Sequence, residues 1–528
     1  MATYTEQDWD GKAYPNDLEG NVDPVSSAYA SPEEVIREDD VAGRNPIFRR
    51  LRKIFDMGVE ARGIERVPED ERNGQHTIGL LLFWWSVNMV VSTVPIGLLA
   101  QAYYTLTFRS AVAAIVSFTA LGAACTAFIA TLGPKTGLRT MVITRYTMGF
   151  VGATIFSFLN ILTQLGFSVT AVILGGQTLT NVSDGKLPLE ASIVLVGVLA
   201  LVLCFVGYNA MHYWERYAWI LLFVFYCCMW GLASKRGFQM DLQQASQATG
   251  KEYAGDFLSF GGIVFSSASG WAPVAADFNC RLPSTIKPWK VFILTWFGLM
   301  VPLLFVEILS AALMTVPDYA AAFEEGSAGG VLSEVFEPWK GGGKFILVIF
   351  AFSIISNCIP NTYSAALSFQ TLLPVFQKIP RALWTVLVFV IYTVAAVAGR
   401  EHFSEILSNF LAILGYWVAF FVIVVLEEHY IFRYWFHRNG HNSSGPARGY
   451  DLAVYDKPRQ LPIGAAGIFA CCCGAGAAIV GMAQVWYIGP VGKLFGEYGG
   501  DLGFEMSAIV TAIVFPPLRY LEYRVFRR

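Results

Sequence analysis

Long apolar stretches separated by short polar loops make up most of the chain after residue 76. A membrane-spanning helix needs roughly 20 apolar residues, and about twelve stretches have that length. The predicted spans are 77–102, 110–133, 148–177, 190–209, 214–234, 257–276, 290–315, 345–373, 381–399, 404–426, 461–486 and 503–518. The hydrophobic pattern therefore predicts an all-α polytopic membrane protein.

The composition agrees with this fold class. Of the 528 residues, 55% are hydrophobic and only 15% are charged, whereas soluble domains usually carry about 25% charged residues. Residues 1–76 are polar and show no pattern of a cleavable signal peptide, so we predict a cytoplasmic tail that is mostly disordered. Its basic segment around Arg49 and Lys53 either lies on the membrane as an amphipathic helix or is solvated.

Lysine and arginine residues indicate the orientation of the spans. If the N-terminus is placed in the cytoplasm, the inner loops hold basic residues such as Lys135, Arg281 and Arg433. The outer loop 316–344 is then acidic. Inner loops of membrane proteins carry an excess of lysine and arginine. With an even number of spans, both termini are therefore predicted to be cytoplasmic.

Two predicted spans, the first and the sixth, are interrupted by polar residues, glycine and proline. The first contains Ser86, Asn88 and Pro95, and the sixth contains Gly270 and Pro273. Glycine and proline are common in membrane helices. Interrupted spans at matching positions of two halves nevertheless indicate the binding site of a transporter built from inverted repeats.

The eighth span carries two amides on either side of a proline. Asn357 and Asn361 are four residues apart, so they share one face of a helix. Pro360 should kink or open that helix near Ser356, whose carbonyl group it approaches. Amides at membrane depth need partners, so they either bind a small planar solute or join helices to each other. Trp271, next to the interruption in the sixth span, could stack on such a solute.

Acidic residues are rare within the predicted spans. Glu215 begins the fifth span beside Arg216, and Glu307 lies about two thirds of the way along the seventh. An acid inside a membrane is a candidate for proton transfer, although Glu215 could equally pair with Arg216. We therefore name Glu215 and Glu307, together with Asn88, as candidates for gating or proton coupling.

The chain resembles the fungal purine–cytosine permeases of the nucleobase–cation symporter group. The matching stretches follow each other in order over nearly all of residues 60–523. They are RGIERVPEDER, WWSVNM, GPKTGLRTMVITRYTMGF, YWERYAW, GWAPVAADF, SNCIPNTYSAALSFQ, FLAILGYWVAFFVIVVLEEHYIFR and FPPLRYLE. The resemblance implies proton-coupled uptake of adenine, guanine, hypoxanthine and cytosine at the plasma membrane.

The same resemblance implies a leucine-transporter-like fold with two inverted five-helix repeats and two further helices. The transmembrane domain would cover residues 77–518, and a cytoplasmic tail would follow at 519–528. The repeats would cover about 77–234 and 257–426, and the further helices about 461–518.

The resemblance also implies a substrate site. The matching residues are Ser86, Trp271, Asn357, Pro360 and Asn361, and Glu215 matches an acid that affects transport. The third span departs from the family pattern GW-x-x-x-N, because Phe167 and Ala171 stand at those two places. Phe167 can still stack on a base, whereas Ala171 cannot form a hydrogen bond, a loss of about 1–3 kcal/mol. Vitamin B6 carriers share the family, so pyridoxine stays an alternative substrate.

The expected mechanism is alternating access. A base would stack between Trp271 and Phe167, while Asn361 and Ser86 would contact its edge. A non-transporting nutrient sensor on the same scaffold and a passive channel are the alternatives from other classes, although no filter loop or charge ring is visible. We find no nucleophile–base pair, metal set or phosphate loop. We therefore expect no enzyme, no metal, no cofactor besides a coupling proton and no nucleic-acid partner; the oligomeric state is not predicted.

Overall fold

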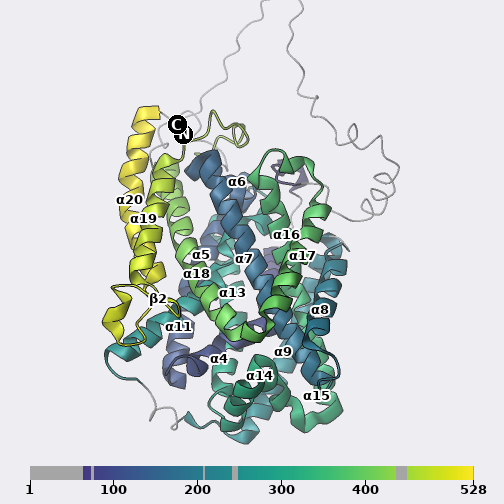
Figure 1. Ribbon diagram of the computed structural model, residues 1–528. Coiled ribbons are helices and arrows are strands. Elements are labelled where there is room, and N and C mark those ends of the chain that lie inside the picture. The colour runs from purple at the N-terminus through teal and green to yellow at the C-terminus, as the bar shows by residue number, and fades with distance from the viewer. Residues whose placement is uncertain (1–62, 73–76, 206–207, 241–247, 436–448, 527–528) are drawn as a thin grey trace, which may run out of the picture. The chain divides into compact units, whose positions relative to one another are not determined.

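The computed structural model describes residues 63–72, 77–205, 208–240, 248–435 and 449–526. The basic segment around Arg49 and Lys53 lies outside the described residues. At least one helix lies within each of the twelve predicted spans (Figure 1). In the first half of the chain the elements are η1 (Glu69–Glu71), α3 (Thr77–Asn88), η2 (Val91–Thr93), α4 (Val94–Ala102), α5 (Phe108–Thr136), α6 (Thr140–Ile143), α7 (Arg145–Val182), α8 (Leu189–Cys204) and α9 (Tyr208–Arg236).

The second half of the chain repeats this pattern and adds two helices. Its elements are α11 (Lys251–Ser269), η3 (Ala272–Val274), α12 (Ala275–Asn279), α13 (Pro288–Leu313), α14 (Pro317–Phe336), η4 (Glu337–Trp339), α15 (Lys340–Ser353), α16 (Ile355–Leu372), η5 (Phe376–Lys378), α17 (Arg381–Gly399), η6 (Arg400–His402), α18 (Phe403–Glu427), the π-helix η7 (Glu428–Trp435), α19 (Ala465–Gly481), β1 (Ala483–Gln484), β2 (Tyr487–Ile488), η9 (Gly492–Phe495) and α20 (Gly503–Phe526).

The lengths of the helices agree with a polytopic membrane protein. Within the described residues, eight helical segments are long and apolar enough to cross a membrane, or nine if α3 and α4 form one bent span. One of these segments contains both α17 and α18, and α8 and α19 are shorter apolar helices. The described helices are therefore compatible with the predicted number of spans.

The region predicted as the outer loop 316–344 contains a helix. α14 is kinked at Gly326 and Ser327, and it buries Val331 and Val335 against the rest of the protein. The hydrophobic pattern placed this segment between two spans and indicated no helix in it. The acidic residues of this segment lowered its apolar content, which hid the short apolar face that packs in the structure.

The predicted span 461–486 is also too long at its C-terminal end. α19 ends at Gly481, and the chain then forms the antiparallel pair β1 and β2. Gln484 in this hairpin is buried and donates a hydrogen bond to Asp501 at 2.7 Å. The helix has already ended before this contact, because Met482 has extended backbone dihedral angles.

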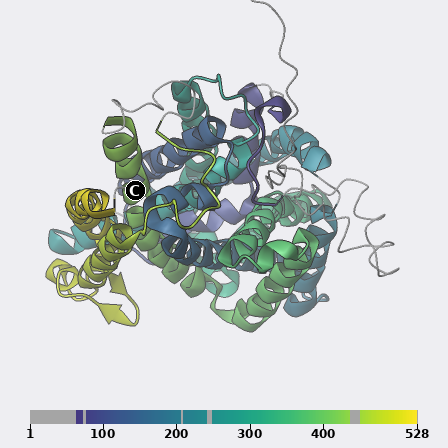
Figure 2. The same cartoon turned by 90° about the horizontal axis from the view of Figure 1, so that it is seen from above.

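The contacts between helices divide the spans into groups. α13 packs against α3, α4 and α5, and α11 also packs against α5. In a second group, α7 packs against α8, α16 and α17. The pair α19 and α20, drawn in yellow at one edge of the helices in Figure 2, packs on α18. The interrupted first and sixth spans thus share one group, whereas α7 and α16 lie in the other.

Small residues let helices from the two halves approach closely. On α4, a Cβ atom at Gly97 would overlap the main-chain oxygen of Glu307 on α13. On α5, a Cβ atom at Gly122 would lie 2.5 Å from the main-chain oxygen of Phe265 on α11. Membrane helices depend on such close packing because lipid is as apolar as their own side chains. The glycines therefore hold α4 and α5 directly against α13 and α11.

Candidate functional site

The first span is interrupted where the sequence predicts. α3 ends at Asn88, and the two halves of the span are bent by 63° relative to each other. The side chain of Asn88 donates a hydrogen bond to the main-chain oxygen of Trp84 at 2.8 Å, and its own main-chain oxygen accepts one from Thr93 at 2.9 Å. These bonds satisfy main-chain groups that the interruption would otherwise leave without partners. The Asn88 side-chain oxygen stays available for a further contact.

The sixth span is interrupted at the matching place, and Trp271 connects it to the first. α11 ends at Ser269, and Trp271 precedes the short helix η3. The indole Nε1–H of Trp271 donates a hydrogen bond to Asn88 Oδ1 at 3.0 Å. Trp84 packs edge-on against the same indole, with 5.8 Å between ring centroids. The two interrupted spans are therefore joined side chain to side chain.

Phe167 on α7 faces Trp271 from the second group of helices. The two rings are nearly parallel, with an angle of 8° between their planes and 6.1 Å between their centroids. Stacked bases are about 3.4 Å apart, so a base between two rings needs them roughly 7 Å apart. The ring of Phe167 also lies over Gly270, where a Cβ atom would be 2.7 Å from Phe167 Cζ. The two centroids are therefore slightly closer together than a base between the rings requires.

The two amides of α16 are bonded to each other and to the first interruption. Asn361 donates to Asn357 Oδ1 at 2.9 Å, and Asn357 donates to the main-chain oxygen of Val87 at 3.3 Å. This chain of bonds places both amides on one face of α16 and beside the first span. Asn357 thereby serves partly as a contact between helices, which was the alternative interpretation of these amides.

The interruption near Pro360 lies further from the proline than predicted. The helix is interrupted at Ile354, between α15 and α16, and not at Ser356. The main-chain oxygen of Ile354 accepts from both Asn357 N and Cys358 N at 2.9 Å. The turn before Pro360 is therefore tightened, and this tightening moves the break two residues toward the N-terminus.

Several buried polar atoms around these residues bond to no described residue. They are Ser86 Oγ, Ser168 Oγ, Ser269 Oγ and Asn361 Oδ1. Each belongs to a residue next to, or bonded to, one already placed at the site. Buried polar atoms in proteins nearly always have a partner, so this group indicates a place for a polar ligand. Ser168 was missed in the sequence, although it directly follows Phe167.

Three further predicted residues have different surroundings. Ala171 lies one turn after Phe167 on α7 and is fully buried within the apolar core. Glu215 lies on α9, but its side chain is outside the described part of the chain. Glu307 is fully buried on α13, where Ser267 and Thr119 lie within hydrogen-bonding distance of its carboxyl group.

Asp277 lies on α12, at the C-terminal end of the sixth span, and was not named in the sequence analysis. Asp277 on α12 accepts a hydrogen bond from Thr140 N at 2.7 Å and one from Ser364 Oγ on α16 at 3.4 Å. Arg139 donates to the main-chain oxygen of Asp277 at 2.7 Å. Asp277 therefore joins the two groups of helices through α12, α6 and α16. The signal available in the sequence was an acid five residues after Ala272 in an otherwise apolar stretch.

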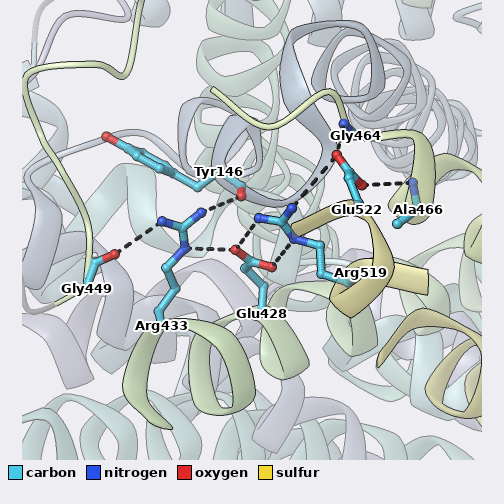
Figure 3. A network of polar contacts seen from close by, with 8 residues as sticks. All are labelled: Tyr146, Glu428, Arg433, Gly449, Gly464, Ala466, Arg519 and Glu522. Carbon is cyan, nitrogen blue, oxygen red and sulfur yellow. Dashed lines mark hydrogen bonds and ion pairs between the residues drawn. The ribbon is translucent and has the colours of Figure 1, made fainter. Parts of the chain in front are cut away.

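A second polar network lies apart from these residues, at the end of α18 (Figure 3). Glu428 is bonded to Arg433 at 2.8 Å and to Arg519 of α20 at 2.9 Å and 3.1 Å. Arg433 also donates to the main-chain oxygen of Tyr146 at the start of α7. Glu522 of α20 accepts hydrogen bonds from the first residues of α19, at Gly464 N and Ala466 N. The network therefore fastens α19 and α20 to α18 and α7, and we assign it a structural role.

Comparison with known proteins identifies the family. Residues 66–493 match the family model described as a permease for cytosine/purines, uracil, thiamine and allantoin. The chain belongs to this permease family. The purine-cytosine permease fcyB of Emericella nidulans is 34% identical over 523 residues, which cover 98% of this chain and 99% of the relative. The vitamin B6 transporter TPN1 of Saccharomyces cerevisiae is 31% identical, with 90% of each chain covered.

A solved structure confirms the fold of this permease. Mhp1, a nucleobase-cation-symport-1 family transporter in a closed conformation with bromovinylhydantoin bound, matches with a TM-score of 0.66 at 14% identity. The match covers 89% of this chain and 97% of Mhp1. The permease therefore has the leucine-transporter-like fold that the resemblance implied. It is a multi-pass membrane transporter and not an enzyme, as expected.

Proposed function

We propose that this permease is a proton-coupled symporter that imports purine bases and cytosine across the plasma membrane, with both termini in the cytoplasm. The observation that carries the proposal is the parallel pair of rings, Phe167 and Trp271, at the point where the two interrupted spans meet. Flat aromatic faces bind nucleobases by stacking, which contributes about 1–3 kcal/mol per base. The names of the curated relatives, purine-cytosine permeases among them, support the same class of substrate.

The polar groups at the site suit the edge of a neutral base. In our proposal, Asn361 Oδ1 accepts a hydrogen bond from an amino or ring N–H group of the base, because this buried oxygen bonds to no described residue, whereas one of the two amide N–H groups is donated to Asn357. Ser86 can donate or accept through its hydroxyl group. The site residues described here are aromatic, amide and hydroxyl side chains, which leaves a charged substrate without a counter-charge. Asn357 and Pro360 hold Asn361 in place from the same helix.

Alternating access would use the two groups of helices. The base is held between Trp271, on an interrupted span of one group, and Phe167, on α7 of the other. Movement of one group against the other would open the site first to the outside and then to the cytoplasm. Asp277 bridges the same two groups at the cytoplasmic end through Ser364, so its contacts would break when the site opens inward.

Pyridoxine is the second candidate substrate. It is also a small polar aromatic, and the curated relative TPN1 is a vitamin B6 transporter. The departures at Phe167 and Ala171 favour a shifted specificity, because Ala171 offers no hydrogen bond to a base. A pyridoxine carrier would use the same stacking pair with a different set of polar contacts.

Uptake in a host without its own carriers tests the proposal. Labelled cytosine, adenine, hypoxanthine and pyridoxine would be supplied separately, with and without a protonophore. Saturable uptake of a base that the protonophore collapses would support the symporter and name its substrate. Uptake of pyridoxine alone would identify vitamin B6, and not a nucleobase, as the substrate. No uptake of any of them, with protein detected at the cell surface, would contradict transport of both classes and favour a sensor.

Replacing Phe167 with alanine tests the stacking pair. We expect the KM for the transported base to rise about tenfold to a hundredfold, since one stacking face worth about 1–3 kcal/mol is removed. Phe158→Ala is the matched control, because Phe158 lies on the same helix but is 53% exposed on its outer face. Concentration-dependent uptake of both variants measures the effect. An unchanged KM in Phe167→Ala would place the base elsewhere.

A further inference from the structure

Glu307 is fully buried, and none of the described residues is a cationic partner of its carboxyl group. Ser267 Oγ of α11 lies 3.0 Å from Glu307 Oε1, and Thr119 Oγ1 of α5 lies 3.5 Å from Oε2. Among the described residues, only these two side chains interact with the carboxyl group, and neither is charged. A carboxylate buried without a cation is strongly unfavourable, whereas a neutral carboxylic acid needs only hydrogen bonds. The surroundings of Glu307 therefore suit the form that carries a proton.

The hydrogen bonds around Glu307 can be counted, and the protonated form allows all of them to be made at once. The single hydroxyl hydrogen of Ser267 is also within reach of the main-chain oxygen of Val264, at 2.8 Å. It cannot be donated to Val264 and Glu307 at once. If Glu307 is protonated, its O–H donates to Ser267 Oγ, Ser267 donates to Val264, and Thr119 donates to Oε2. Every donor and acceptor in this cluster then has a partner.

Loss of the proton would change the hydrogen bonds of α11. The carboxylate would need the Ser267 hydrogen, which would turn away from the main-chain oxygen of Val264. Ser267 lies only three residues before Gly270, where the sixth span is interrupted. The protonation state of Glu307 would therefore change the hydrogen bonds of Ser267, which lies one helical turn before Trp271.

Glu307 is in contact with the first interrupted span as well. Gly97 on α4 packs directly on the main-chain oxygen of Glu307. Glu307 thus touches both interrupted spans, α4 through its main chain and α11 through its side chain. Thr119 adds α5, which follows the first interrupted span in the chain. A proton bound at this position is placed to influence both breaks that form the substrate site.

The other titratable groups on the helices around α13 do not act on Glu307. Apart from Asp256, the charged residues of α5, α9 and α11 whose side chains the structure describes lie in the end turns of these helices, at Arg109, Lys135, Lys235, Arg236, Lys251 and Glu252. Asp256 of α11 bonds to Thr105. Tyr226 of α9 packs on Phe305, and residues two positions apart on a helix point in different directions. The described groups that face Glu307 are therefore the two hydroxyls.

We propose that Glu307 binds the coupling proton, and that Ser267 and Thr119 position its carboxyl group. This inference rests on the proposed function, since it names the proton site of the same symporter. One proton adds to the carboxylate from the outer side and leaves to the cytoplasm with each base transported. The neutral acid, with Ser267 donating to Val264, is the state that moves with substrate.

Purified protein in liposomes tests this proposal. Accumulation of labelled base would be driven by a gradient of one pH unit with the membrane potential clamped to zero. With one proton per base, such a gradient supports at most about tenfold accumulation. We expect Glu307→Gln, which mimics the neutral acid, to exchange labelled for unlabelled base. The ratio of labelled base inside to outside should nevertheless stay at about one. Glu505→Gln is the matched control, because Glu505 is also an acid without a described partner but lies on α20.

Each outcome decides one point. Near-tenfold accumulation by Glu307→Gln would overturn the proposal while leaving the symporter intact. Absence of proton-driven accumulation in the unmodified protein would overturn the proposed function and the inference with it. If Glu307→Gln does not fold, Ser267→Ala replaces it, because this variant removes the acceptor of the Glu307 proton. We then expect the external pH of half-maximal uptake to shift, and an unchanged pH profile would contradict the role of Glu307.

Discussion

Replacing Asn361 with alanine is expected to abolish high-affinity uptake while the protein still reaches the plasma membrane. The change removes Oδ1, a buried acceptor that bonds to no described residue and that we assign to the substrate. Loss of a buried hydrogen-bonding partner costs about 1–3 kcal/mol, which is about tenfold to a hundredfold in affinity. The change also removes the donor to Asn357 Oδ1, so the second amide of the site is no longer held in place.

A matched variant separates substrate binding from folding. Asn160 on α7 is also a buried amide, bonded to Ser368 of α16 at 2.8 Å. Asn160→Ala removes a contact between α7 and α16. We therefore expect less of this variant at the cell surface, with an unchanged KM for the base. Uptake kinetics and surface labelling of the two variants measure the difference. Normal uptake by Asn361→Ala would remove this residue from the site.

The local chemistry of the chain was enough to locate the two interruptions. Pro95 and Pro273 donate no main-chain N–H, and Gly270 has no side chain to stabilise a helix. These properties act within one or two turns, so they can be recognised in a sequence. The helices over the predicted spans follow for the same reason, because span length depends on a continuous apolar stretch. The hidden helix α14 shows the limit, since its apolar face is short and surrounded by acids.

The partners of the site residues could not be predicted in the same way. Trp271 donates to Asn88, which is 183 positions away in the chain. Thr119 lies 188 positions from Glu307. Apolar periodicity indicates which face of a helix is buried, but not which residue of another helix it meets. The resemblance to permeases brought Trp271 and Asn361 into one site, whereas the bond to Asn88 and the role of Asp277 came only from the structure.

The network at the end of α18 leads to a second large expected effect, on stability rather than on affinity. Glu428→Gln would leave the guanidinium groups of Arg433 and Arg519 without the carboxylate that neutralises them. The side chains of Glu428 and Arg519 are only 1% and 2% exposed. Removing one partner of a buried ion pair typically costs about 3–5 kcal/mol, since the remaining charge stays buried. We therefore expect a clearly lower melting temperature in detergent and less protein at the cell surface.

The control for this prediction is an ion pair on the surface. Glu190 bonds to Arg400 at 2.8 Å, but its side chain is 46% exposed, and pairs of this kind contribute little because water screens them. The melting temperature of Glu190→Gln, measured in the same detergent, should therefore be close to that of the unmodified protein. If the melting temperature of Glu428→Gln is also close to that of the unmodified protein, water or a neighbouring group must replace the lost carboxylate. The hydrogen bonds from Gly464 N and Ala466 N to Glu522 would still join α19 to α20 in that variant.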